Sequence, residues 1–339
     1  MNVEGRNVLI TGGAGFIGSH LAEGYLSRNA GKVVVYDDFS TGSIENLRHI
    51  KDERLKIVRG SIFDSDKLDK TVAKWKIDIV EHLAAELEVY SSIRDSKRDA
   101  CINILGTLNV LNAALKNNVK RVIFASSGAV YGEAKYLPID EEHPLEPHWP
   151  YGVSKLSAER YMLQYYKLFG LKTTALRYGI VYGPREWFGR VLTMFIKRIF
   201  LENKPPVVFG DGSQTRDFVY VGDVIEAHML AVENEEAVGQ VFNIGSGKGT
   251  SIKELAELLI DMSGKKLEEI YDNPVEGSAS RFQPERIRLR GELKNFVLDC
   301  RKAQKLLGWR PKTQFEDGLK REIEWILKFP SRWNTKPRV

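Results

Sequence analysis

A tyrosine followed four residues later by a lysine on one helix face is a pair that can take up and release a proton. Two such spacings occur in the sequence, Tyr131 with Lys135 and Tyr151 with Lys155. Tyr151 follows Pro150 and opens a long amphipathic stretch, so the second pair is the one predicted to share a helix face. There the Lys155 ammonium can lower the pKa of the Tyr151 phenol, which makes that phenol a general base near neutral pH.

A serine hydroxyl could share a substrate hydroxyl with that tyrosine. Ser126 and Ser127 follow the predicted strand Arg121–Ala125, and open α/β sheets bind their ligands at the carboxyl ends of the strands. We choose Ser127 for this role. The alternative interpretation is that Tyr151 only caps a helix, that Lys155 is a solvated side chain, and that the serines form a turn.

A glycine-rich loop has the pattern of a dinucleotide-binding turn. The strand-like run Asn7–Thr11 leads into the sequence GGAGFIG at residues 12–18, and a helical stretch follows. Gly12 permits a tight turn, Gly15 lets a pyrophosphate approach the backbone, and Gly18 allows the helix to pack closely. The N–H groups at the start of that helix would then face the phosphates.

Two aspartates follow the next strand-like run, Val33–Tyr36. The carboxylate of Asp37 would accept hydrogen bonds from the adenosine ribose and repel a 2′-phosphate, which favours NAD over NADP. Asp38 beside it adds to that repulsion. The loop and the aspartates together predict NAD as the cofactor, the alternative being that the glycines merely make a turn.

Short β-branched runs alternate with amphipathic stretches in the first half of the chain, a rhythm that predicts an α/β fold with a doubly wound, Rossmann-like parallel sheet. The predicted strands are Asn7–Thr11, Lys32–Tyr36, Leu55–Val58, Asp78–Leu83, Arg121–Ala125 and Thr173–Leu176. The predicted helices are Phe16–Arg28, Asp64–Trp75, Tyr90–Lys116, Tyr151–Phe169, Val191–Leu201, Val221–Val232, Ile252–Met262 and Ala303–Leu307.

The pattern becomes irregular after Arg177, where glycine and proline interrupt it repeatedly. This change predicts a second, smaller domain of mixed α/β structure. We divide the chain into a cofactor domain over residues 1–178, to which the chain returns around residues 219–245, and a mainly substrate-binding domain over residues 179–330. A short tail covers residues 331–339.

The composition argues against several other classes of protein. The formal charge of +5 is small for 339 residues, and the basic side chains are interleaved with acids, so we expect no nucleic-acid partner. Cys101 and Cys300 have no metal-ligand spacing, which predicts no metal site and a reducing compartment. The sequence contains no leader-like or bilayer-spanning run, so we expect a cytoplasmic protein without a membrane partner.

A set of longer motifs occurs in one order over most of the chain. They are TGGAGFIGSH, YDDFSTG, HLAA, NILGT, ASSGAVYG, YGVSK, LRYGIVYGPRE, GDGSQTRDFVYVGD and LDCRKAQKLLGW. By these motifs the chain resembles the extended short-chain dehydrogenases/reductases, and among them the NAD-dependent nucleotide-sugar epimerases and dehydratases. The resemblance implies tightly held NAD, a catalytic centre of Ser127, Tyr151 and Lys155, and usually a homodimer.

The resemblance also implies cofactor contacts beyond the glycines and aspartates. Phe16 and Ile17 in the loop would contact NAD, as would Ser61 and Ile62 after the third strand. Ser61 stands where the family usually has an adenine-contacting aspartate. It can still form a hydrogen bond there, but it carries no charge.

The likeness is strongest to the UDP-galactose (UDP-glucose) 4-epimerases. It implies that Tyr151 removes the proton of the sugar 4-hydroxyl while C4 passes a hydride to NAD. The transient 4-keto sugar then turns over and takes the hydride back on its other face. Dehydratases and decarboxylases of the family carry additional acids at positions that are Gly128 and Ala129 here, which favours the epimerase branch.

A UDP-sugar substrate would be held mainly by residues after the sixth strand. The resemblance places Arg216 on the diphosphate with Phe218 nearby, and the backbone of Val207 and Phe209 along the uracil edge. Asn103 would help at the inner end of the pocket.

Three positions bear on the choice of sugar and nucleotide. The large ring of Phe296 favours glucose and galactose over their N-acetyl forms. Ile180 replaces an asparagine that usually contacts the sugar or the diphosphate, and Leu289 stands where a second phosphate-binding arginine is expected. Arg288 or Arg290 could replace that arginine, or both could be surface charges.

Other functions stay open at this point. Arg185 and Arg190 could pair with the carboxylate of a uronic acid, which would make the chain a UDP-glucuronate 4-epimerase. A nucleotide-sugar reductase or dehydrogenase would instead consume or release NADH with each sugar. A non-catalytic NAD-binding regulator or scaffold is the alternative outside enzymes, but its usual sign, the loss of Tyr151 or Lys155, is missing.

Overall fold

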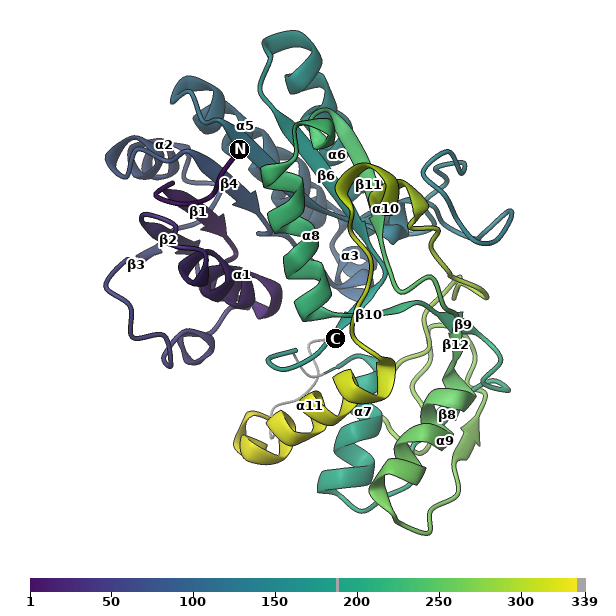
Figure 1. The fold of residues 1–339 in the computed structure, drawn as a ribbon. Helices are drawn as coiled ribbons and strands as arrows, with labels where there is room; N and C mark the ends of the chain where they lie inside the picture. Colours follow the sequence, from purple (N-terminus) through teal and green to yellow (C-terminus); the bar gives the residue numbers. More distant parts are fainter. Residues whose placement is uncertain (187–188, 334–339) are drawn as a thin grey trace.

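A computed structural model describes residues 1–186 and 189–333, and a parallel sheet of seven strands lies at its centre (Figure 1). The strands are β1 (Val8–Thr11), β2 (Val33–Asp37), β3 (Leu55–Arg59), β4 (Ile79–His82), β5 (Arg121–Ser127), β6 (Thr173–Tyr178) and β11 (Gln240–Ile244). They lie in the order β11-β6-β5-β4-β1-β2-β3. The order reverses between β1 and β4, which confirms the predicted doubly wound α/β fold.

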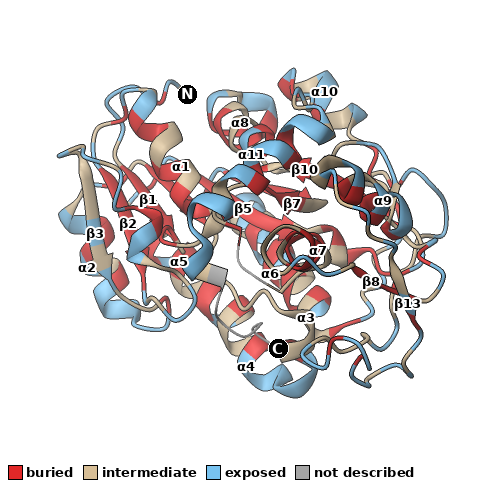
Figure 2. Cartoon of the chain, turned by 90° about the horizontal axis from the view of Figure 1, so that it is seen from below, coloured by how far each residue is buried: buried red, intermediate tan, exposed pale blue. Residues whose placement is uncertain are grey.

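Helices cover both faces of this sheet, which explains why its strands are short runs of apolar residues rather than alternating ones. Side chains of α1 (Phe16–Ser27), α8 (Val221–Glu233) and α10 (Arg301–Leu307) join the apolar core on one face. Side chains of α2 (Ser65–Lys74), α5 (Gly106–Lys116) and α6 (Pro150–Phe169) form the core on the other face. Figure 2 shows the buried strands in red between helices whose outer sides are exposed.

The prediction of one helix over Tyr90–Lys116 is wrong, because the segment is broken before α5. α3 (Val89–Arg94) ends at Asp95, whose backbone leaves the helical region with φ −140° and ψ 74°. The Asp95 carboxylate then caps α4 (Ser96–Ala100) by accepting a backbone N–H at 2.9 Å. A π-helical turn over Cys101–Leu105 connects α4 to α5.

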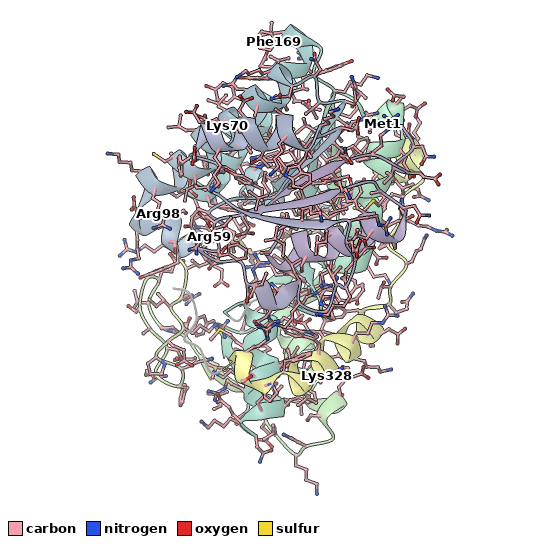
Figure 3. All side chains as sticks on the ribbon, turned by 90° about the vertical axis from the view of Figure 1, so that its left-hand side faces the viewer. Met1, Arg59, Lys70, Arg98, Phe169 and Lys328 are labelled. Atoms are coloured by element: carbon pink, nitrogen blue, oxygen red, sulfur yellow. The ribbon has the colours of Figure 1, made fainter. Side chains whose placement is uncertain are left out.

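A smaller mixed α/β part follows β6. It contains the strand pairs β7 (Ile180–Tyr182) with β10 (Phe218–Tyr220), β8 (Val207–Phe209) with β13 (Ile270–Asp272), and β9 (Thr215–Arg216) with β12 (Thr250–Ser251). The helices α7 (Val191–Ile196), α9 (Ile252–Ser263) and α11 (Phe315–Lys328) share a separate apolar core. Phe169 at the end of α6 and Lys328 at the end of α11 lie toward opposite ends of the molecule (Figure 3).

The large sheet recruits a segment from late in the chain, since α8 and β11 fall within the range 219–245. The division of the chain at residue 178 stays a prediction, and residues 334–339 of the predicted tail lie outside the described residues. Within the described ranges, no helix is both long and apolar enough to cross a bilayer.

Candidate active site

A cavity of about 1240 Å³ lies between the carboxyl edge of the large sheet and the smaller part of the chain. The predicted site residues that line it are Gly12, Gly15, Phe16, Ile17, Gly18, Asp37, Asp38, Ser61, Ile62, Ser127, Tyr151, Lys155, Phe209, Arg216, Phe218 and Phe296. The predicted residues outside its lining are Asn103, Val207 and Arg288. The cavity includes the crevice where the strand order reverses, which is where open α/β sheets bind their ligands.

The glycine loop between β1 and α1 tolerates no side chain at two of its positions. Gly12 has φ +69°, and a Cβ there would lie 2.8 Å from the backbone nitrogen of Ala84. A Cβ on Gly18 would lie 2.4 Å from the carbonyl oxygen of Gly12. Gly15 precedes the first residue of α1 and adds no side chain of its own. The loop therefore presents bare backbone and a helix N-terminus to the cavity, which suits a pyrophosphate.

Asp37 joins this loop to the end of β2. One carboxylate oxygen accepts the N–H of Ala14 at 2.9 Å, and the other accepts the N–H of Phe39 at 2.8 Å. Burial raises the pKa of the Asp37 carboxyl. Because each carboxylate oxygen has two lone pairs, both oxygens could still accept a ribose hydroxyl.

Tyr151 and Ser127 meet at the wall of the cavity. Tyr151 is the second residue of α6, and its backbone N–H donates to Ser92 Oγ at 3.1 Å. Ser127 ends β5, and its hydroxyl is hydrogen-bonded to the Tyr151 side chain. Ser126 points elsewhere, because its hydroxyl donates to the buried carboxylate of Glu159 at 2.8 Å. The geometry thus separates the two candidate serines.

Lys155 lies one helical turn beyond Tyr151 and is deeply buried. Only 3% of the residue is exposed, and Nζ lies 4.2 Å from the centre of the Phe124 ring. Burial lowers the pKa of Lys155 to about 7, although the carboxylates of Asp99 and Glu159 oppose this shift.

The cation that acts on the tyrosine differs from our expectation. Burial raises the pKa of Tyr151, while the hydrogen bond from Ser127 and the positive charge of Arg190 lower it. The pKa of Tyr151 is raised overall, whereas we expected Lys155 to lower it, and the cationic charge that opposes the rise comes from Arg190. Arg190 precedes α7 and lines the cavity. The sequence suggested Arg190 only as a partner for a uronic acid.

The second tyrosine–lysine spacing has a structural role. The Tyr131 hydroxyl is fully buried, donates to Asn243 Oδ1 at 2.7 Å and accepts from Arg177 Nη1 at 2.8 Å. Lys135 forms a surface ion pair with Glu146 at 3.1 Å. The prediction that Tyr151 and Lys155 are the pair on one helix is confirmed.

Asn103 does not reach the cavity, contrary to the expectation that it helps at the inner pocket. It lies in the π-helical turn and is 2% exposed. Its side chain accepts the N–H of Glu86 at 2.9 Å and donates to the carbonyl of Glu86 at 3.0 Å. The same amide donates to Asp99 and to Ser154, which lies next to Lys155. Asn103 therefore fixes the loop after β4 to the start of α6.

At the end of the cavity predicted for the nucleotide, the lining includes an arginine that was not among the predicted residues. Arg216 lines the cavity, and its Nη2 lies 3.6 Å from Glu292 Oε1. Arg288 and Arg290 are absent from the lining, and Arg288 Nη1 donates instead to the Pro274 carbonyl at 3.1 Å. Arg286 lines the cavity beside Leu289, and sequence analysis missed it because no motif covers it.

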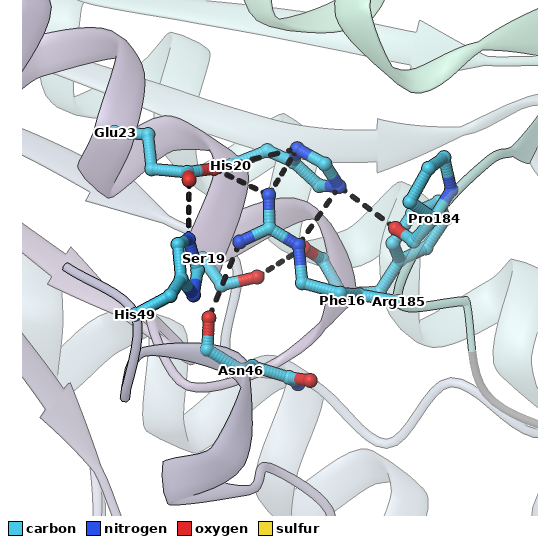
Figure 4. Close-up of polar contacts among 8 residues, drawn as sticks. All are labelled: Phe16, Ser19, His20, Glu23, Asn46, His49, Pro184 and Arg185. Carbon is cyan, nitrogen blue, oxygen red and sulfur yellow. Dashed lines mark hydrogen bonds and ion pairs between the residues drawn. The ribbon is translucent and has the colours of Figure 1, made fainter. Parts of the chain in front are cut away.

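Arg185 links the smaller part of the chain to the cofactor end (Figure 4). Its backbone has φ 74°, and its guanidinium forms an ion pair with Glu23, contacts the His20 ring and donates to the carbonyl of Asn46 at 3.2 Å. The His20 ring lies 2.8 Å from the Pro184 carbonyl. Arg185 thus has protein partners on α1 and on the loop after β2, which differs from the predicted uronate contact.

Comparison with known proteins places these features in a known context. The chain matches the protein family described as GDP-mannose 4,6 dehydratase over residues 9–322. A putative UDP-glucose 4-epimerase of Methanocaldococcus jannaschii is 39% identical, with 94% of this chain and 98% of that protein aligned. The UDP-glucose 4-epimerase of Thermotoga maritima, solved with UDP-glucose, is 37% identical with a TM-score of 0.86 over 96% and 99% of the two chains. The UDP-glucuronic acid 4-epimerase of Bacillus cereus, solved with UDP-glucuronic acid and NAD, is 34% identical with a TM-score of 0.85 over 95% and 99%.

Proposed function

Because this chain belongs to the extended short-chain dehydrogenase family of nucleotide-sugar epimerases and dehydratases, we propose that it interconverts UDP-galactose and UDP-glucose with bound NAD. The observation that carries this proposal is the hydrogen-bonded pair of Ser127 and Tyr151 in the cavity wall. The wall beside that pair carries no carboxyl group at residues 128 and 129.

The cofactor end of the cavity fits NAD. The bare loop at Gly12 and Gly18 leaves room for a pyrophosphate against the backbone, and Asp37 offers carboxylate lone pairs to a ribose. Lys155 would donate to the nicotinamide ribose. A 2′-phosphate would meet the charges of both Asp37 and Asp38, so NAD is favoured over NADP.

Tyr151 is the proposed base. Ser127 would hold the sugar 4-hydroxyl while the Tyr151 phenolate takes its proton, and Tyr151 would return that proton to the opposite epimer. NAD held by the glycine loop, Asp37 and Lys155 would supply reversible hydride transfer at the sugar C4. Burial of the site would keep water from the 4-keto sugar between these steps.

Phe296 supports epimerisation over dehydration. A Cβ on Gly128 would lie 2.1 Å from Cζ of the Phe296 ring, so the ring fills the space in which an acid at position 128 would stand. Ala129 likewise offers no proton-transfer group. Without an additional acid, the site has no group in this wall to remove water across C5 and C6 of the sugar.

A second candidate function rests on Arg190. This residue lines the cavity, its charge acts on the Tyr151 hydroxyl, and its Nη1 lies 4.0 Å from Glu186 Oε1. A carboxylate on a sugar bound at Tyr151 would find a counter-charge there, so UDP-glucuronate is the alternative substrate. Arg185 gives this alternative no support, because its guanidinium contacts Glu23 and His20.

We also propose a homodimer in which α6 takes part. Val153, Tyr161 and Leu168 lie along one stripe of α6 and are exposed, Leu168 to 69%. Such a stripe of large apolar side chains suits burial against a second copy. Light scattering on the purified protein tests the dimer, and a monomer at micromolar concentration would contradict it.

The deciding experiment for the reaction uses the purified protein without added cofactor. Incubation with UDP-galactose, and separately with UDP-glucuronate, is followed by NMR, with Tyr151→Phe as the control. Formation of UDP-glucose supports the proposed epimerase and its bound NAD together. Turnover of UDP-glucuronate alone moves the assignment to the uronic acid. Stoichiometric release of NADH would indicate a dehydrogenase, and no turnover of either sugar, with NAD added, would contradict both proposals.

A further inference from the structure

A second guanidinium faces the cavity at the end that the proposed function assigns to the nucleotide. Arg286 lines the cavity together with Phe209, Arg216 and Leu289. Its guanidinium carbon lies 4.0 Å from the centre of the Phe209 ring, and Nη1 donates to the Val207 carbonyl at 2.5 Å. Burial lowers the pKa of Arg286 to about 10, so the side chain is charged at neutral pH.

The backbone around Arg286 explains why this arginine is the one that points inward. Its N–H donates to the Gln283 carbonyl at 2.8 Å, and its carbonyl accepts from the N–H of Ser280 at 2.9 Å. Ile287 then pairs with Ala279 in an antiparallel bridge. These bonds fix the direction of the side chain, whereas Arg288 two residues later turns to Asn273 and the Pro274 carbonyl.

The charge of Glu292 acts on both Arg216 and Arg286, and its carboxylate also lies 3.7 Å from Arg288 Nε. Arg216 Nη2 lies 3.6 Å from Glu292 Oε1, and the Glu292 charge is the main electrostatic influence that raises the pKa of both arginines against their burial. Glu292 itself lines the cavity. Three guanidiniums near a single carboxylate leave positive charge uncompensated at this wall. The two of them that line the cavity, Arg216 and Arg286, suit an anion with charge on two neighbouring groups.

Leu289 presents an aliphatic side chain to the same cavity. We propose that Arg286, acting with Arg216, holds the diphosphate of the nucleotide-sugar in place of the arginine expected at position 289. This inference rests on the proposed function, since it takes a nucleoside diphosphate sugar as the substrate. Arg286 precedes Leu289 by three residues in the chain. The side chain of Leu289 is shorter than that of an arginine, which leaves space in the cavity for the Arg286 guanidinium.

Binding to the NAD-loaded protein tests this inference without relying on turnover. UDP, dTDP and GDP are titrated by calorimetry and uridine by ligand-observed NMR, using the wild type, Arg286→Gln and the matched control Arg288→Gln. Loss of a charge-assisted contact to phosphate predicts a roughly 10- to 100-fold weaker affinity of Arg286→Gln for the tightest-binding diphosphate. Uridine affinity should be unchanged, and Arg288→Gln should lose less than about threefold.

A rescue variant distinguishes phosphate binding from a structural role. Arg286→Gln combined with Leu289→Arg should recover at least about tenfold of the lost affinity, because the guanidinium returns by the other route. Unchanged UDP affinity in Arg286→Gln, or an equal loss for UDP and uridine, would overturn the inference. A diphosphate that binds through Arg286 without turnover of either UDP-sugar would instead contradict the proposed function and leave this inference standing.

Discussion

The two ends of the cavity are built in different ways. The cofactor end is one continuous loop between β1 and α1 together with Asp37, and it presents mostly backbone. The end proposed for the nucleotide is assembled from residues within 209–218 and 285–296, which lie far apart in the chain, and it presents long side chains. A site formed by backbone groups requires positions without side chains. A site formed by side chains requires only that some residue nearby directs a suitable side chain into the cavity.

This difference determines how much change each end tolerates. A single methyl group at Gly18 collides with the Gly12 carbonyl, and no other residue can supply the missing space. At the nucleotide end a guanidinium can enter from position 286 instead of 289. The cofactor end should therefore be intolerant of small substitutions, and the nucleotide end should be open to compensation.

The largest effect is expected where the two ends meet. Tyr151→Phe removes the proposed base and should reduce the epimerisation rate by about 10³-fold or more while bound NAD and UDP affinity stay unchanged. Tyr131→Phe is the matched control, because the Tyr131 hydroxyl is hydrogen-bonded to Asn243 and Arg177 within the fold. This variant should lower the free energy of unfolding by about 1 kcal/mol and leave the epimerisation rate unchanged. Steady-state NMR assays and urea unfolding measure both, and a Tyr151→Phe protein with near wild-type activity would refute the assignment.

The intolerance of the cofactor end is tested with two glycines of the same helix. Gly18→Ala should weaken NAD binding by roughly 10- to 100-fold, because the added methyl group clashes with the backbone of the loop and forces the loop to move. Gly24→Ala should have a smaller effect on NAD binding, since its Cβ would meet Cγ2 of Ile225 at 2.9 Å and Cε of Met229 at 3.0 Å, which are side-chain atoms of α8 and not backbone of the loop. The NAD content of the purified variants decides the matter, and equal content in both would break the contrast between the two ends.

A pH-dependent effect is expected at the Arg185 contact. Burial and the neighbouring Arg185 lower the pKa of His20 from 6.5 to about 4. The folded protein therefore binds fewer protons than the unfolded chain between these values, and stability falls as the pH drops through that window. Urea unfolding at pH 7 and pH 4.5 should show that His20→Gln removes on the order of 2 kcal/mol of this acid sensitivity. Identical losses in wild type and variant would contradict it.

The smallest effect concerns the sugar pocket. Phe296→Leu shortens the side chain that covers Gly128, at a cost of about 1 kcal/mol in the free energy of unfolding. It should raise kcat/KM for UDP-N-acetylgalactosamine relative to UDP-galactose by a few fold, because a methyl-sized space opens beside the sugar. Competition assays with both substrates measure the ratio. No change in the ratio would show that the ring does not limit the pocket.

Local sequence patterns predicted much of the fold and the cofactor end. Each of the six predicted strands exists, because short apolar runs between amphipathic helices are specific to a buried parallel sheet. The break at Asp95 and the π-helical turn were missed, since their cause is a side-chain cap and packing around Asn103 rather than hydrophobic periodicity. α11 was also missed, although Leu319, Ile323 and Ile326 follow a helical spacing.

Contacts between distant segments account for the remaining differences in the site. Arg286 was overlooked because its inward direction depends on bonds to Gln283 and Ser280, which no spacing reveals. Arg190 was considered for a substrate carboxylate, but its action on Tyr151 requires the residue before α7 to line the same cavity as the start of α6. The Asn103 amide was expected in the pocket, but it is hydrogen-bonded to the backbone of Glu86 instead. That contact depends on the conformation of the loop after β4, which the sequence pattern does not reveal.

The crossing of Arg185 from the segment after β7 to Glu23 and Asn46 has a consequence for life in the cell. Phe16, Asn46 and Arg185 all line the cavity, so two further stretches of chain lie beside the glycine loop at its cofactor end. A cofactor retained by these contacts would act as a prosthetic group rather than as a cosubstrate that dissociates in each cycle. The catalytic cycle would then be insulated from the metabolic balance between oxidised and reduced dinucleotide, and the supply of interconverted sugar would follow the amount of protein alone.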